Sequence, residues 1–228
     1  MSSGQPTRRA LENLTAEIVG CRACPRLVAW RELVGREKRA SFADESYWAR
    51  PVPGFGDPDA RLLIVGLAPA AHGGNRTGRV FTGDRSGDWL FAALHRAGYA
   101  NQPTSVRADD GLELHDAYVA AAVRCAPPQN KPTITERDRC LPFLVHEMSL
   151  LPRVQVIVVL GKFAYDVVAG LLSLPRPRPK FGHGVEAPVP NGPAVLCSFH
   201  PSQQNTFTGK LTVSMFDAIF TRAHELSR

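Results

Sequence analysis

Four of the five cysteines have a spacing that suits a metal site. Cys21 and Cys24 form a Cys-x-x-Cys pair, whereas Cys125 and Cys140 are single residues with fourteen others between them. Structural zinc usually takes two close pairs, although single ligands occur, and an iron–sulfur cluster takes four thiolates at scattered spacings. Cys125 and Cys140 could instead be small core residues, as unpaired cysteines often are, and Cys197 in its apolar run is assigned to the core. The spacing favours a four-cysteine metal site and leaves the metal open.

A second set of residues suits the binding of a flat or anionic group. The apolar run 61–66 is rich in β-branched residues, stops at Gly66 and opens into the small residues Ala68, Pro69 and Ala70. Small residues let backbone N–H groups approach a ligand closely. An ordinary turn from strand to loop would have a similar sequence. The chain has neither a Walker lysine pattern nor G-x-G-x-x-G, so a small-molecule enzyme that uses this loop for phosphate is a weaker hypothesis.

The apolar pattern supplies elements that can position these residues. Short apolar runs predict buried strands at 61–66, 117–124, 154–160 and 194–199. The expected helices cover 8–19, 26–38, 86–98, a segment from about 135, 162–172 and 210–226. Ser86 is expected to cap the third of these helices. Strands that alternate with helices predict an α/β fold with a parallel sheet covered on both faces.

The candidate residues follow three of the predicted strands. They lie in the loop 66–84, in the segment 125–130 and in the segment 200–205. Because the carboxyl ends of parallel strands meet at one edge of a sheet, we expect these segments to form a single site there.

The bulk composition allows one α/β domain and favours an acidic partner. With 228 residues, 44% of them hydrophobic, the chain can bury a real core, and we expect a single domain over 1–228 in which 1–60 is an N-terminal helical extension. The formal charge of +6 and the many arginines suit phosphate contacts, although basic composition alone is weak evidence. No apolar run is long enough for a membrane or secretory segment, so we expect a cytoplasmic protein whose cysteines serve metal binding or catalysis.

Taken jointly, Gly66-Leu67-Ala68-Pro69-Ala70, the four cysteines and His200-Pro201-Ser202 resemble the family 5 uracil-DNA glycosylases. These are iron–sulfur members of the uracil-DNA glycosylase superfamily, and the resemblance extends over nearly the whole chain, including 48–57 and 75–79. It implies a three-layer α/β/α sandwich with a central, largely parallel four-stranded sheet. It also implies a [4Fe–4S] cluster on Cys21, Cys24, Cys125 and Cys140, which would tie the N-terminal extension to the core.

The resemblance further implies base excision repair of DNA that contains uracil or other deaminated bases. The N-glycosidic bond would be hydrolysed, leaving an abasic site without strand cleavage. His200 would stabilise the departing base, Asp84 would position or deprotonate the water, and Asn130 is the second polar candidate. Without the family, Asp84 could equally be a helix cap and Asn130 a turn residue.

The same resemblance implies the residues that contact the flipped base and the DNA. Phe81 would stack on the base, although it could also be a core aromatic. The base-binding set is Gly66, Ala68, Pro69, Ala70, His72, Gly73 and Phe81. The DNA-binding set is Arg76, Arg79, Ser202, Gln203, Gln204, Asn205 and Lys210, of which the basic members could also be ordinary surface charges. The loop 200–205 would enter the minor groove with polar side chains in place of an apolar wedge.

Two departures from the wider superfamily affect the expected selectivity. The first loop has Ala68-Pro69-Ala70 where many relatives have an acidic or amide side chain, and the second strand has Ala120-Ala121-Ala122 where relatives place a uracil-reading asparagine. Loss of that reader predicts a wider pocket that also accepts hypoxanthine. The alternatives are a uracil-only family 4 enzyme and a non-catalytic, metal-stapled nucleic-acid-binding module. We expect a monomer that acts in association with a bacterial nucleoid.

Overall fold

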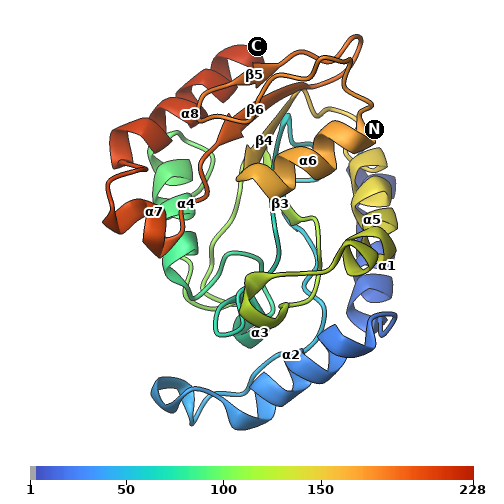
Figure 1. Cartoon of the computed structure of the whole chain (residues 1–228), viewed down its shortest axis with the longest axis vertical. Helices are drawn as coiled ribbons and strands as arrows, with labels where there is room; N and C mark the ends of the chain where they lie inside the picture. Colours follow the sequence, from blue (N-terminus) through green and yellow to red (C-terminus); the bar gives the residue numbers. More distant parts are fainter. Residues whose placement is uncertain (1–3) are drawn as a thin grey trace.

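A six-stranded sheet lies between two layers of helices in the computed structural model (Figure 1), which describes residues 4–228. The strand order is β1-β3-β2-β4-β6-β5. The four central strands are parallel, namely β3 (Ala117–Ala121), β2 (Leu62–Gly66), β4 (Val156–Leu160) and β6 (Ala194–Ser198). The two-residue strands β1 (Phe55–Gly56) and β5 (Glu186–Ala187) pair antiparallel at the edges. The expected four-stranded parallel centre is confirmed, and the edge strands extend it.

The two faces of the sheet carry separate apolar cores because successive strand residues point to opposite sides. Ile64 and Val158 face α4 (Arg85–Arg96) and α8 (Val213–Leu226) on one side. Leu63 and Ile157 face α5 (Ile134–Ser149) and α6 (Lys162–Leu171) on the other, where α1 (Gly4–Gly20) adds Leu11. Figure 1 shows α1 and α5 side by side, and they are in contact. The α/β/α sandwich predicted from the family resemblance is confirmed.

The helix starts differ from the predicted ones in one informative place. The cap of α4 is Asp84, whose carboxylate accepts a hydrogen bond from the backbone N–H of Gly87, so the prediction that Ser86 caps this helix is wrong. Thr133 begins α5 through a reciprocal capping box with Glu136, and the helix continues through Pro142. The remaining helical elements are α2 (Pro25–Glu37), η1 (Ala40–Phe42), α3 (Gly74–Thr77), η2 (Pro128–Asn130) and α7 (Gln203–Phe207).

The sheet order places a crevice beside β2 and β4. β2 connects through α4 to β3 on one side, whereas β4 connects through α6 to β6 on the other. Neighbouring parallel strands whose connections leave in opposite directions open a ligand crevice at their carboxyl ends. No helix in residues 4–228 has the length and apolar character that a membrane crossing needs.

Candidate active site and cysteine cavity

A cavity of about 460 Å³ opens at the carboxyl edge of the sheet. Its walls come from the segments after β2, β3 and β6, which are far apart in the sequence. The lining residues are Leu67, Ala68, Pro69, Ala70, Phe81, Asp84, Arg85, Ser86, Asn130, His200, Ser202, Gln203 and Gln204. The three segments that the sequence places at strand ends therefore meet at one cavity.

Phe81 is fixed in the wall by two close approaches of glycine. A Cβ atom at Gly66 would lie 2.6 Å from the Phe81 ring, and one at Gly87 would lie 1.7 Å from the Phe81 carbonyl oxygen. Phe81 itself has a left-handed backbone with φ of 52°. Its ring lies 5.9 Å from the His200 ring, centroid to centroid, at a tilt of 32°. The site therefore holds an aromatic face against the end of β2, ready to stack on a planar ligand.

Asp84 combines a structural bond with a place in the cavity wall. Its Oδ1 accepts the Gly87 N–H at 3.0 Å as the cap of α4. The other oxygen lies against Gly73, where a Cβ atom would be only 2.0 Å from Oδ2. Burial raises the pKa of Asp84, while hydrogen bonds from the backbone of Gly87 and Ser86 oppose that shift. A half-buried carboxylate with a raised pKa is suited to accept a proton.

His200 provides a neutral imidazole in the cavity wall. Burial lowers its pKa to about 4, so the imidazole is uncharged at neutral pH. Its backbone carbonyl accepts a hydrogen bond from Asn205 Nδ2 at 2.9 Å, and this contact ties the loop after β6 to α7. A neutral imidazole in this place can donate one N–H to a developing negative charge without bringing a second charge into the cavity.

Asn130 lies exposed at the mouth, at the end of the 3-10 helix η2. Gln129 and Asn130 both have left-handed backbones, with φ of 53° and 56°. Asparagine tolerates this conformation better than most residues because its short amide can bond locally. The turn places Asn130 among the residues that line the cavity.

The loop after β6 and the start of α4 complete the rim. Ser202 caps α7 through a 3.4 Å bond from the Asn205 N–H, and Gln203 and Gln204 line the cavity. Sequence reasoning missed Leu67, Arg85 and Ser86, which adjoin residues that it did identify. Arg85 directly follows the predicted site segment 66–84, and this position was the signal that could have identified it. Its guanidinium lies 4.3 Å from the ring centroid of Phe207, a residue that is 67% exposed.

Two arginines expected to contact phosphate are buried instead. Arg76 bonds the His72 carbonyl at 2.8 Å and pairs with Glu45, and Arg79 pairs with Asp110 at 2.8 Å. Their exposed fractions are 6% and 5%. Both guanidinium groups are thus committed to internal partners, and neither is free in this structure to reach a DNA backbone.

Four further predicted residues lie near the cavity without lining it. His72 bonds Tyr47 through Nδ1 at 2.9 Å, and burial lowers its pKa. Gly66 allows the Phe81 ring to pack closely against the backbone, and Gly73 does the same for the Asp84 carboxylate. The Lys210 ammonium lies 4.9 Å from the centroid of the Phe199 ring. Gly66 and Gly73 therefore lie directly behind wall residues, whereas His72 and Lys210 contact residues that are not part of the lining.

The four cysteines Cys21, Cys24, Cys125 and Cys140 line a second, small cavity. It lies where the start of α2 meets the segment after β3 and the first turns of α5. Within residues 4–228, no three His, Cys, Asp or Glu side chains come close enough to hold a single metal ion. A tetrahedral zinc ion would draw its sulfur ligands to within roughly 4 Å of one another, since each Zn–S bond is about 2.3 Å long.

Two of these cysteines accept hydrogen bonds from buried donors, one of them a guanidinium group and the other a backbone N–H. Arg31, only 2% exposed, donates from Nη1 to Cys125 Sγ at 2.9 Å, and the Arg124 N–H donates to Cys140 Sγ at 3.2 Å. Burial raises the pKa of Cys125 to about 12 and that of Cys140 to about 11. A thiolate here therefore needs cations beside it, and the Arg31 guanidinium supplies one.

Comparison with known proteins places this arrangement in a defined group. The family described as the Uracil DNA glycosylase superfamily matches residues 53–223. The chain is 56% identical over 216 residues to a Type-5 uracil-DNA glycosylase from Mycobacterium tuberculosis, covering 94% of this chain and 81% of the relative. It is 54% identical to the Type-5 enzyme from Mycobacterium leprae, covering 96% of each chain. The Type-5 enzyme from Thermus thermophilus is 50% identical, with 95% of this chain and 98% of the relative covered.

Proposed function

Because the chain belongs to the Uracil DNA glycosylase superfamily, we propose that a damaged base is removed in the cavity at the carboxyl ends of β2 and β6. The enzyme is a DNA glycosylase that removes uracil in DNA repair, in keeping with Type-5 relatives at 50% to 56% identity over nearly the whole chain. The observation that carries the site assignment is the meeting of Phe81, Asp84, Asn130 and His200 around one cavity.

The substrate base must leave the duplex to reach this cavity. A volume of about 460 Å³ lies within the range of sites that enclose small ligands, so a flipped nucleoside fits by size. The Phe81 ring, held over Gly66, provides one face for the base to stack on. The small side chains of Ala68, Pro69 and Ala70 leave room on the wall beside it.

Bond cleavage leaves negative charge on the base and positive charge on the sugar. His200 is neutral above about pH 4 and donates a hydrogen bond to a carbonyl oxygen of the departing base. On the sugar side, the Asp84 carboxylate takes a proton from the attacking water and stabilises the cationic centre. The cap bond holds Oδ1, so Oδ2 is the oxygen we assign to the water. Asn130 orients that water or the sugar from the mouth.

Selectivity among deaminated bases follows from β3. Ala120 and Ala121 lie in this strand with Ala122 directly after it, all three are buried, and none of them lines the cavity. No carboxamide from this strand, among residues 4–228, therefore reads the edge of the base. We propose that the enzyme accepts hypoxanthine as well as uracil.

The surface that meets DNA is the rim of the same cavity. We assign Ser202, Gln203 and Gln204 to the minor-groove side, supported by Asn205 and by Lys210 beside Phe199. Since Arg76 and Arg79 are buried, we assign the phosphate contact to Arg85, which lines the cavity. We propose that the enzyme acts as a monomer, and that it works in the bacterial cytoplasm at the nucleoid, where a DNA repair enzyme meets DNA.

The cysteine cavity suits a [4Fe–4S] cluster on Cys21, Cys24, Cys125 and Cys140. Two observations support this proposal: the four side chains line one cavity, and the Arg31 guanidinium beside Cys125 would offset the negative charge of bound thiolates. When bound, the cluster would cross-link the segment before α2, the segment after β3 and the first turns of α5. The hydrolysis itself is carried by the residues of the first cavity.

A glycosylase assay tests the proposed site. Labelled duplexes with uracil, hypoxanthine or a normal base are incubated with the cluster-loaded enzyme, and alkali reveals abasic sites. We expect release of uracil and hypoxanthine but of no normal base, with large losses in Asp84→Ala and Asn130→Ala. Uracil release without hypoxanthine release would overturn the relaxed selectivity. Full activity in Asp84→Ala would overturn its role, and DNA binding without any base release would support the binding-module alternative.

A further inference from the structure

The segment that carries Phe81 and Asp84 has a conformation that it does not hold by itself. Phe81 has φ of 52° and Gly83 has φ of 72°, so two left-handed residues follow each other within three positions. A residue with a side chain adopts this conformation at an energetic cost, and surrounding contacts must fix it. Those contacts lie outside the cavity, in the loop between α4 and β3.

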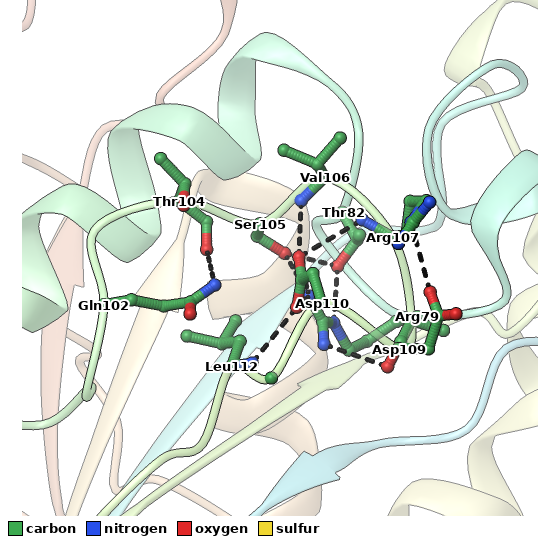
Figure 2. A network of polar contacts seen from close by, with 12 residues as sticks. Arg79, Thr82, Gln102, Thr104, Ser105, Val106, Arg107, Asp109, Asp110 and Leu112 are labelled. Carbon is green, nitrogen blue, oxygen red and sulfur yellow. Dashed lines mark hydrogen bonds and ion pairs between the residues drawn. The ribbon is translucent and has the colours of Figure 1, made fainter.

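Arg79 links the segment to that loop in a buried network (Figure 2). Its Nε donates to Thr82 Oγ1 at 2.9 Å, and its Nη2 donates to Ser105 Oγ at 2.9 Å and to Asp110 Oδ1 at 2.8 Å. Its Nη1 donates to the Ala108 carbonyl at 3.2 Å. The Asp110 side chain is 12% exposed, so this is a desolvated, multiply bonded ion pair.

Asp110 also shapes its own loop. Its carboxylate accepts the N–H groups of Val106 at 2.7 Å, Arg107 at 3.2 Å and Leu112 at 3.1 Å (Figure 2). Burial alone would raise the pKa of Asp110, but the Arg79 guanidinium and these N–H groups hold it below its usual value. One carboxylate thus gathers the loop and anchors Arg79.

The loop in turn holds the peptide units next to Asp84. The Ser105 carbonyl accepts the Gly83 N–H at 2.8 Å, and the Ser105 hydroxyl lies 2.6 Å from Thr82 Oγ1. The Gly83 carbonyl accepts a hydrogen bond from Arg76 Nη2 at 3.0 Å. Both sides of Gly83 are therefore fixed, one by the loop and the other by a buried arginine.

We propose that Asp110 is a positioning residue for base release, acting through Arg79 and Ser105 on Phe81 and Asp84. The inference rests on the proposed function, in which those two residues contact the base and the water. Asp110 itself does not line the cavity. Its loss should leave DNA binding nearly unchanged and slow the chemical step, because the reacting groups are misplaced while the rim is intact.

The test compares Asp110→Asn with Asp116→Asn in the cluster-loaded enzyme. Asp116 is the control, since it also pairs with an arginine, accepting hydrogen bonds from Arg61 Nε and from the Arg61 backbone N–H at 2.8 Å each, but it lies at the amino ends of β2 and β3 and is 30% exposed. We expect Asp110→Asn to lower the single-turnover rate of uracil release about 10- to 100-fold, with the Kd for uracil-containing DNA within about threefold. Asp116→Asn should keep its rate, and thermal unfolding of both variants shows how much stability each one loses.

Two further variants keep the inference testable. Asp110→Glu retains the charge and should recover much of the rate, and Ser105→Ala removes one hydroxyl link and should slow release about threefold without unfolding the protein. Equal rates of uracil release in Asp110→Asn and Asp116→Asn would overturn the proposal. If Asp110→Asn does not fold, an unchanged rate in Ser105→Ala would overturn it instead. Asp84→Ala is assayed alongside. If it too keeps its rate, the proposed function fails rather than this inference alone.

Discussion

Gly66→Ala should displace the Phe81 ring, the aromatic face proposed to stack on the flipped base. Gly66 ends β2 in a regular parallel register with Ala121, so alanine meets no backbone obstacle. The new Cβ would lie 2.6 Å from Phe81 Cζ and 2.7 Å from Cε2, and ordinary van der Waals contact begins at 3.4 Å. The ring must therefore move by roughly 0.8 Å, the difference between 3.4 Å and 2.6 Å. Because the backbone of Phe81 is held in place, we expect the side chain to rotate toward the cavity.

The expected cost has two parts. Overpacking of this kind destabilises by about 1 to 3 kcal/mol, which lowers Tm by about 3 to 10 °C in a chain of this size. A shift near 1 Å in a group that positions the substrate costs up to about 100-fold in rate, so we expect uracil release to slow about 10- to 100-fold.

Single-turnover release of uracil at saturating enzyme measures this effect, with thermal unfolding measured in parallel. Gly170→Ala is the control, because Gly170 lies in α6 and an added Cβ there would meet no atom within 4 Å. Alanine at this position should keep the rate and slightly raise stability. A Gly66→Ala enzyme that releases uracil at the parental rate would refute the reasoning that the ring must stay over Gly66.

Three other outcomes follow from the same geometry. Because burial raises the pKa of Asp84, its carboxylate takes up a proton at a higher pH than a free aspartate does, so acidification should slow uracil release while the pH is still above about 4. Asp84→Asn should remove this pH dependence and lower the rate about 100-fold or more. Arg85→Gln should reduce the slope of log K against log salt by about 1, whereas buried Arg79→Gln should lower Tm and leave the slope unchanged, as measured by DNA titrations at several salt concentrations. Iron chelation should remove the visible absorbance of the cluster and lower Tm at the same time. Cys140→Ser should lose this absorbance, whereas Cys197→Ser should retain it, because Cys197 lies in the apolar core and not in the cysteine cavity.

The sheet was predictable because its strands are continuous apolar runs buried on both faces. The short elements were not. The two-residue strands β1 and β5 and the helices α3 and α7 are too brief to show a period, and contacts from distant segments decide them. The prediction of a single site also followed from the sequence, since strand ends of a parallel sheet share one edge.

The roles of Arg76 and Arg79 could not be predicted in the same way. Each looks like a surface cation in a glycine-rich loop, and its partner is far away in the sequence. Asp110 lies thirty-one residues from Arg79 in an irregular loop, and Glu45 lies thirty-one residues from Arg76. Only the folded structure shows that both arginines form ion pairs within the protein.

Asp84 shows why a structural and a catalytic interpretation need not exclude each other. As the cap of α4, its Oδ1 accepts the Gly87 N–H, and that bond helps to orient the side chain. Gly73 then leaves just enough space for Oδ2 at the wall, so the cap bond that stabilises the helix also aims the other oxygen. Sequence reasoning treated cap and base as alternatives because it could not see that the two oxygens have different neighbours. The carboxylate is suited to act on water because the bond from the start of α4 to Oδ1 orients Oδ2.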